Sequence, residues 1–246
     1  LQAIQDDEYW FPYHYVAQYK NGFSQYYNDT WGINYIATIE FILNKLEREH
    51  YYSLIDIGCG DGRLVKEVQD KFPNKVVEGI DYSERAINLA KAMNPRGAYY
   101  CLDIEKEKPL HGEYDIALLI EVFEHILPEK AEVFLNSVKN IISKEGLLYI
   151  TVPHVNKPLE YKHYRHFSVK SLLECLKKYF DILEVIPFEK IDVRKSFIDI
   201  LLTNPFFILN MGRGKTFIYK YYKKNLFLAK RESDCQRIFV KAQRRI

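Results

Sequence analysis

Three glycines separated by single residues follow a short apolar run near residue 55 of this 246-residue chain. Residues 54–62 read Leu-Ile-Asp-Ile-Gly-Cys-Gly-Asp-Gly, so the acid Asp56 stands two residues before Gly58. Glycine tolerates left-handed backbone angles and carries no side chain, so such a segment can turn sharply and approach a bound molecule. A dinucleotide-binding turn would need a glycine at position 63, which is Arg63. The residues therefore favour a ligand-binding glycine loop of a different type.

Acids and a histidine stand at the ends of the apolar runs that follow the glycine loop. They are Asp81, Asp103 and the group Glu121, Glu124 and His125. The group has the i, i+3, i+4 spacing that places side chains on one helical face, where they could hold a divalent ion. Any single acid is equally explained as a solvated loop residue or a helix cap. Ligands of doubly wound sheets bind at the carboxyl ends of strands, so acids at successive strand ends together indicate one site.

Short apolar runs alternate with helical patterns from Ser53 to Pro153, which is typical of βαβ units and a parallel sheet. We predict helices that begin near residues 35, 62, 83, 128 and 168, with Ser83 and Ser168 as caps and the last helix running through Tyr179. The predicted strands are Ser53–Ile57, Lys75–Ile80, Ala98–Cys101, Tyr114–Ile120, Gly146–Val152, Ile182–Pro187 and Arg237–Ala242.

The gap between the last two predicted strands is far longer than the usual loop of about 4–6 residues. We therefore predict an insertion with its own structure at residues 189–235 and interpret it as a substrate cap. Residues 1–50 are rich in aromatic side chains and are interpreted as a helical lid. The ligand-binding α/β domain is then formed by residues 51–188 and 236–246.

At the glycine loop and the acids, the sequence resembles the class I (Rossmann-like) S-adenosylmethionine-dependent methyltransferase family, whose first motif is an acid followed by G-x-G-x-G. The resemblance runs from Leu54 to about Phe180 and implies a doubly wound, mostly parallel seven-stranded sheet. It implies S-adenosyl-L-methionine as cofactor and S-adenosyl-L-homocysteine as product. The cofactor-binding residues that it implies are Asp56, Gly58 and Gly60 at the methionine part, Asp81 with Tyr82 at the ribose, Asp103 with Ile104 at the adenine, and Glu121 after the fourth strand.

Methyl transfer is an in-line displacement at a sulfonium carbon, so an enzyme must align the nucleophile and, for a hydroxyl, remove its proton. Histidine is the usual base near neutral pH. We favour His163 or His166 as the base and keep His125 as a further candidate. The alternative for each imidazole is a structural role, as a helix cap or a partner of a backbone carbonyl.

Aromatic and basic residues in the N-terminal segment and after the fifth predicted strand are candidates for substrate binding. Aromatic faces stack on sugars or bases, and phenol hydroxyls bind phosphate or hydroxyl groups. Packing of the helix onto the sheet would explain the aromatic residues equally well. The pattern is loosely similar to methyltransferases of bacterial capsule and lipopolysaccharide pathways. The candidates are Tyr13, His14, His154, Tyr164 and Arg165.

The group Glu121, Glu124 and His125, with a later histidine, resembles the magnesium or manganese site of small-RNA 2′-O-methyltransferases. The same E-x-x-E-H pattern also occurs in ubiquinone-pathway O-methyltransferases. Many class I members carry it without a metal, so we expect no metal in this protein. If an ion bound here, oxygen-rich ligation would favour magnesium or manganese over zinc.

Composition limits the class of protein. A hydrophobic content of 48% excludes a disordered chain. The four cysteines form no C-x-x-C pair, and no apolar run reaches the about 18 residues needed to span a bilayer. The first residues show no secretory signal pattern. The chain begins at Leu1 rather than Met, so further residues can precede it. We expect a cytoplasmic protein.

Charge is unevenly distributed. Residues 211–246 hold eleven Lys and Arg against Glu232 and Asp234, whereas the whole chain has a formal net charge of +2. Such a segment can attract phosphorylated substrates, nucleic acid or acidic lipid, or it is simply a solvated face. Our leading hypothesis is O-methylation of a polar small molecule or a sugar- or phosphate-bearing intermediate of bacterial surface-polysaccharide biosynthesis. The alternatives are a metal-assisted RNA 2′-O-methyltransferase and a non-catalytic binding subunit.

Overall fold

The computed structural model describes residues 2–15, 17–18, 24–25, 31–107, 109, 112–203 and 212–245. Its centre is a seven-stranded sheet in the order β5-β4-β3-β6-β7-β9-β8. Neighbours from β5 to β7 pair in parallel, whereas β9 is antiparallel to both β7 and β8. This is the doubly wound, mostly parallel sheet that the sequence predicts. The strands are β3 (Ser53–Ile57), β4 (Val76–Asp81), β5 (Ala98–Cys101), β6 (Tyr114–Ile120), β7 (Ile142–Pro153), β8 (Phe180–Lys190) and β9 (Cys235–Arg244).

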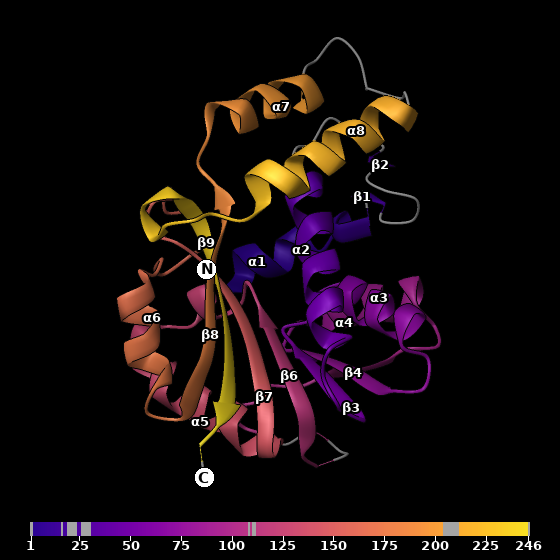
Figure 1. The fold of residues 1–246 in the computed structure, drawn as a ribbon. Coiled ribbons are helices and arrows are strands. Elements are labelled where there is room, and N and C mark those ends of the chain that lie inside the picture. Colours follow the sequence, from indigo (N-terminus) through magenta and orange to yellow (C-terminus); the bar gives the residue numbers. More distant parts are fainter. Residues whose placement is uncertain are drawn as a thin grey trace.

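Helices cover both faces of the sheet (Figure 1). Buried apolar residues of α2, α3 and α4 form one core with one face, and those of α5 and α6 form a second core with the other. Both faces of the parallel strands are therefore covered, which explains why these strands read as nearly continuous apolar runs. The helices are α1 (Gln2–Glu8), α2 (Trp31–Leu46), α3 (Arg63–Lys71), α4 (Glu84–Met93), α5 (Ala131–Ile141), α6 (Val169–Leu176), α7 (Val193–Thr203) and α8 (Gly212–Tyr222).

The predicted helix caps are confirmed, with differences at two helix ends. The Ser83 side chain accepts a hydrogen bond from the backbone of Ala86, and Ser168 forms a reciprocal capping box with Ser171. The helix that follows Ser168 ends at Leu176 rather than at the predicted Tyr179. Pro128 opens a 3₁₀ turn, and the α-helix after it begins only at Ala131.

The insertion between β8 and β9 holds α7, α8 and a π-helical turn at Lys223–Phe227. Its second half packs on α2: the Tyr222 hydroxyl donates to Asn34 at 2.8 Å, and the Phe227 and Phe41 rings lie 5.6 Å apart. Figure 1 shows α7 and α8 beyond the carboxyl ends of the parallel strands, on the same side as α1 and α2. Residues 204–211 of the predicted cap lie outside the described residues.

The predicted N-terminal lid contains α1, a 3₁₀ turn at Tyr13–Tyr15 and a short antiparallel pair, β1 (Ala17–Gln18) with β2 (Ser24–Gln25). Helix α1 is tied to two separate parts of the domain. Arg85 of α4 contacts the backbone of Asp6, and Lys162 after β7 binds Glu8 at 2.9 Å. None of the helices in the described residues has the length and apolar character needed to cross a membrane.

Candidate functional site

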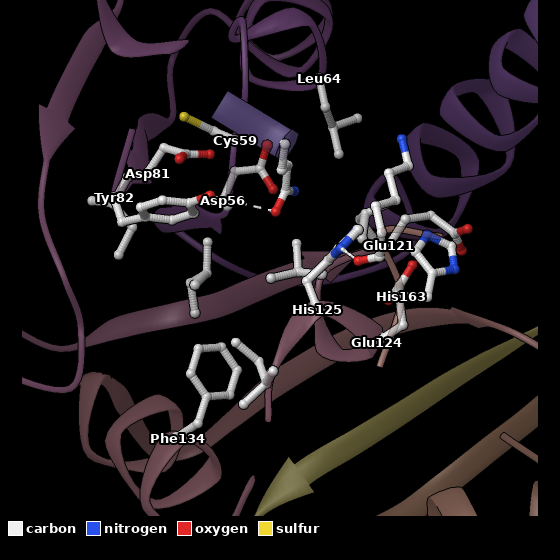
Figure 2. A pocket seen from close by; sticks show the side chains of 18 of the residues that line it. Asp56, Cys59, Leu64, Asp81, Tyr82, Glu121, Glu124, His125, Phe134 and His163 are labelled. Atoms are coloured by element: carbon white, nitrogen blue, oxygen red, sulfur yellow. Dashed lines mark hydrogen bonds between the residues drawn. The ribbon is translucent and has the colours of Figure 1, made fainter. Parts of the chain in front are cut away.

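A cavity of about 600 Å³ lies at the carboxyl ends of β3, β4 and β6. Strand β3 lies between β4 and β6, so the chain changes direction across the sheet at this position. Ligands of doubly wound sheets bind at such switch points. Figure 2 shows Asp56, Asp81 and Tyr82 on one side of the cavity, and Glu124, His125 and His163 on the other.

The glycine loop adopts a backbone that other residues rarely tolerate. Gly58, Gly60 and Gly62 have φ angles of 74°, 55° and 76°. A Cβ at Gly58 would lie 2.6 Å from a Val122 methyl group, so neighbouring side chains leave no room for one. The backbone N–H of Gly58 donates to the carbonyl of Ile80 at 2.8 Å. The loop is therefore held against the end of β4.

Two buried acids stand beside the loop. Asp81 accepts hydrogen bonds from the backbone of Gly60 at 3.0 Å and of Ser83 at 2.9 Å, one on each carboxylate oxygen. Burial raises the pKa of Asp81 despite these bonds, and burial together with the Asp81 charge raises the pKa of Asp56 to about 8. A neutral Asp56 at pH 7 is ready to ionise when a cation binds next to it.

The residues expected at the adenine and ribose also line the cavity. They are Asp103, Ile104 and Tyr82. Asp103 is held by Lys106 at 2.8 Å, and the Tyr82 hydroxyl lies 3.5 Å from the side chain of Gln5 in α1. The contact from α1 means that the N-terminal segment closes over this edge of the cavity.

The N-terminal segment lies directly on the glycine loop. His14 donates its backbone N–H to buried Asp61 at 3.1 Å, and its Nδ1 lies 2.8 Å from the other oxygen of the same carboxylate. A Cβ at Gly60 would lie 2.6 Å from the Tyr9 hydroxyl. Tyr13 and His14 line the cavity, as do Tyr9 and Tyr35, which the sequence analysis missed. Only the unusual aromatic content of residues 9–15 could have indicated Tyr9.

The expectation that Glu121, Glu124 and His125 share one helical face is wrong. Glu121 has a φ angle of 57° and lies before the 3₁₀ turn Phe123–His125, so it leaves the turn in another direction. Its carboxylate accepts from Arg237 Nε at 2.8 Å. Burial favours the neutral acid, but the Arg237 charge and hydrogen bond outweigh it and lower the pKa of Glu121. Glu121 is therefore an ionised partner of Arg237 at the cavity wall.

Glu124 is fully buried, and within the described part of the chain neither of its carboxylate oxygens has a hydrogen-bond partner. Burial and the neighbouring Glu121 charge raise the pKa of Glu124 well above its ordinary value. A buried polar group without a partner is rare and calls for an explanation. Because Glu124 also lines the cavity, its side chain can meet a bound molecule or ion.

Backbone carbonyls fix the tautomers of three neighbouring histidines. His125 Nδ1 lies 3.0 Å from the Lys162 carbonyl, and His166 Nδ1 lies 3.0 Å from the Lys157 carbonyl. A carbonyl only accepts, so both Nδ1 atoms carry protons. Neutral His166 then accepts at Nε2 from His163 Nδ1, 2.8 Å away. His125 and His163 consequently keep Nε2 atoms with free lone pairs.

All three imidazoles resist protonation. Burial lowers the pKa values of His125 and His166, and burial together with the His125 charge lowers the pKa of His163 to about 3. His125 and His163 line the cavity, whereas His166 stands behind His163 with both nitrogens engaged. The site therefore presents two neutral imidazoles and a buried carboxyl group.

Of the other predicted substrate-binding residues, Tyr164 lines the cavity, but His154 and Arg165 lie outside its lining. His154 Nε2 lies 3.0 Å from Glu232, and its Nδ1 accepts from the backbone of Asn156. The Arg165 guanidinium stacks over the rings of Phe123 and Phe167. These contacts within the protein indicate that His154 and Arg165 have structural roles.

Three basic residues of the C-terminal segment form ion pairs with acidic residues elsewhere in the domain. Lys241 binds Glu49, Arg244 binds Glu113, and Arg245 binds Asp181. These three cations of the C-terminal segment are therefore at least partly neutralised by the rest of the domain.

Solved structures share this fold. The N-methyltransferase NodS of Bradyrhizobium japonicum WM9, in complex with S-adenosyl-l-homocysteine, superposes with a TM-score of 0.57 at 12% identity over 85% of this chain and 86% of that chain. The magnesium protoporphyrin IX methyltransferase ChlM of Synechocystis PCC 6803 gives a TM-score of 0.55 at 14% identity, over 87% and 84%. The fold is thus that of the class I methyltransferases.

A protein family described as "Methyltransferase domain" matches residues 33–183, and the chain belongs to this family. The (S)-coclaurine N-methyltransferase of Thalictrum flavum subsp. glaucum is 28% identical over 120 residues, 47% of this chain and 32% of that protein. The malonyl-[acyl-carrier protein] O-methyltransferase of Halalkalibacterium halodurans is 28% identical over 102 residues, 39% and 37%. The matched segment spans about a third of the length of these two relatives.

Proposed function

We propose that the chain is an S-adenosylmethionine-dependent O-methyltransferase that acts on a hydroxyl group of a polar small molecule. The observation that carries this proposal is the division of the cavity into two sides. Buried acids and the glycine loop form one side, and the Nε2 lone pairs of His125 and His163 face the other, beside Glu124. A volume of about 600 Å³ is within the range of small-molecule sites.

In this proposal the cofactor occupies the side with the glycine loop. Asp81 accepts the ribose hydroxyls, Asp103 and Ile104 contact the adenine, and Asp56 with Gly58 holds the methionine part. Each carboxylate oxygen of Asp81 accepts one backbone hydrogen bond, and a carboxylate offers about four acceptor positions, so capacity for two hydroxyls is left. The sulfonium then faces the Glu124 side.

The acceptor hydroxyl would meet His163 and His125. A neutral imidazole with a free Nε2 accepts a hydrogen bond from the hydroxyl and holds its oxygen in line with the methyl group. His166 has both nitrogens engaged, so in this proposal it is a positioning residue that keeps the Nδ1 proton of His163 on the far side. Of the two histidines that the sequence offered as the base, this proposal therefore favours His163 over His166.

The acceptor class that we propose is a polar small molecule, or a sugar- or phosphate-bearing intermediate of bacterial surface-polysaccharide biosynthesis. Tyr13, Tyr164, Lys157 and Lys162 line the cavity around the histidines and offer phenol and ammonium donors. These groups suit hydroxyl and phosphate oxygens. His154 and Arg165, which do not line the cavity, are left out of this proposal.

A screen for S-adenosylhomocysteine release tests the function. Nucleotide sugars, phosphorylated small molecules, amines and RNA would each be offered to the purified chain, with and without EDTA. We expect turnover with a hydroxyl-bearing small molecule. Turnover with amines alone would make the chain an N-methyltransferase, and turnover with RNA alone would favour the 2′-O-methyltransferase alternative. Cofactor binding without turnover on any class would favour a non-catalytic subunit.

A further inference from the structure

Three potential ligand side chains converge on one point of the cavity wall. One ligand atom from each of Glu124, His125 and His163 lies within 4.8 Å of the other two. Figure 2 shows the three side chains close together at one side of the cavity. We propose that Glu124, His125 and His163 bind a divalent first-row transition-metal ion. This proposal replaces our expectation from the sequence that the protein needs no metal.

The fixed tautomers support a metal site. The Nδ1 proton of His125 is donated to a backbone carbonyl, which can only accept. The Nδ1 proton of His163 is donated to His166, whose own Nδ1 proton is donated to another carbonyl. Each ring therefore offers Nε2 as a lone pair, and neutral imidazole is the form that binds metal ions. A second partner that fixes the tautomer of a ligating histidine is a common feature of metal sites.

The state of Glu124 is a second, independent observation. Its carboxyl group is fully buried beside two lone-pair nitrogens, and both oxygens lack partners in the described part of the chain. A positive ion would satisfy the carboxylate and both Nε2 atoms at once. Small side-chain rotations would bring the three atoms to the metal–ligand distances of about 2.0–2.2 Å of such ligands.

Two other acids nearby each bind a cation through one carboxylate oxygen and do not belong to the set. Glu121 Oε2 is paired with Arg237, whereas its Oε1 has no hydrogen-bond partner among the described residues. The three ligand atoms that converge come from Glu124, His125 and His163, so this set replaces the i, i+3, i+4 set predicted from the sequence. Glu160 Oε2 lies 3.8 Å from His163 Nε2, but its other oxygen contacts Lys157. These acids add negative potential around the site without filling it.

Two imidazoles and one carboxylate favour ions such as Mn²⁺, Fe²⁺ or Zn²⁺ over Mg²⁺, which prefers oxygen ligands throughout. Three protein ligands leave coordination positions open toward the cavity. Resting on the proposed function, we infer that an open position receives the acceptor oxygen. With the ion bound, His125 and His163 hold the metal, and the metal replaces their direct hydrogen bonds to the hydroxyl. A hydroxyl group on a divalent ion is more acidic than a free one, so the ion would help its proton to leave.

Binding of Mn²⁺ to the purified chain, without cofactor or acceptor, tests the site directly. Electron paramagnetic resonance of free Mn²⁺ would give the affinity, with Zn²⁺ as competitor. We expect one strong site. His166→Asn, which removes only the tautomer-fixing ring, should weaken binding by about 10–100-fold, and Glu124→Gln or His163→Asn by more. Exposed Glu129 and His50 provide the matched controls Glu129→Gln and His50→Asn, which should bind like the parent.

Crystals of the parent chain soaked in Mn²⁺ give a test that needs no variant. An anomalous peak between Glu124, His125 and His163 is expected. Absence of a peak there, or equal Mn²⁺ affinity in the parent and in a folded Glu124→Gln chain, would overturn the metal proposal. The function is judged separately, by binding of S-adenosylmethionine and by turnover. Turnover that survives EDTA in a chain lacking the Mn²⁺ site would therefore leave the methyltransferase proposal intact.

Discussion

Arg237 on the last strand donates from Nε to Glu121 at 2.8 Å, and its guanidinium also contacts Glu189 at the end of β8. This one cation therefore neutralises two acids, one of which lies on the wall of the cavity. All three side chains are buried or half-buried. The insertion before β9 returns the chain to the sheet at this position, so the ion pairs join the last strand to the site.

The first prediction concerns this cation. Arg237→Met should lower the free energy of unfolding by about 3–5 kcal/mol, because it leaves the Glu121 carboxylate without its cationic partner. Glu189 keeps its contact with Lys195 at 3.2 Å. Urea denaturation at pH 7 measures the change. The double variant Arg237→Met with Glu121→Gln should recover part of the loss, since one uncompensated charge is then gone. Equal stability of the parent and Arg237→Met chains would contradict an energetic role for the pair.

The second prediction concerns cofactor binding at Asp81. S-adenosylmethionine should raise the melting temperature of the parent chain by mass action. Asp81→Ala should remove most of this shift, because it deletes both the proposed ribose acceptor and the partner of the Gly60 backbone. Differential scanning fluorimetry measures it, with Glu129→Gln as control. Stabilisation by NADH and not by S-adenosylmethionine would contradict the proposed cofactor.

The third prediction follows from the raised pKa of Asp56. With a pKa of about 8, Asp56 is neutral at pH 7 in the free protein. A nearby cationic ammonium of S-adenosylmethionine would favour the carboxylate, so binding should release a proton. Affinity should therefore increase as pH rises toward 8 and level off above it.

Calorimetry at pH 7 in two buffers with different ionisation enthalpies measures the released proton. Asp56→Asn cannot ionise, so this variant should show less proton release and a flatter pH dependence. Its cofactor affinity should also fall, because a neutral amide does not pair with the ammonium. The same proton release in the parent and in Asp56→Asn would assign the titration to another group, such as Asp81.

The sheet could be predicted from the sequence because its signals are local. Apolar runs of strand length and a glycine loop each identify themselves within about ten residues, and β3, β5 and β6 have the predicted bounds. Strand β7 begins at Ile142, four residues before the predicted start, directly after α5 ends at Ile141. Polar residues 143–145 suggest a loop, but a bulge opposite β6 accommodates them in the strand.

The partners within the site could not be predicted, because they depend on packing between distant segments. Asp61 meets His14, 47 positions earlier, and Glu121 meets Arg237, 116 positions later. Spacing alone placed Glu121 on one helical face with Glu124, but the left-handed backbone at Glu121 directs its carboxylate to Arg237 instead. Likewise, sequence gave no means to tell that His163 faces the cavity while His166 supports it from behind.

The last prediction distinguishes His163 from His166 by kinetics. If His163 contacts the acceptor, His163→Asn should lower kcat/KM for the acceptor by about 10²–10⁴-fold while cofactor affinity stays unchanged. His166→Asn should cost less, because His166 only positions His163 and does not itself line the cavity. His50→Asn is the control for a histidine far from the cavity. Equal losses for both variants would give His166 a direct role, and near-normal turnover in both would make the pair structural. Since Mn²⁺ affinity is measured separately on the same variants, a loss of turnover with metal binding intact would assign His163 to the proton of the hydroxyl rather than to the ion.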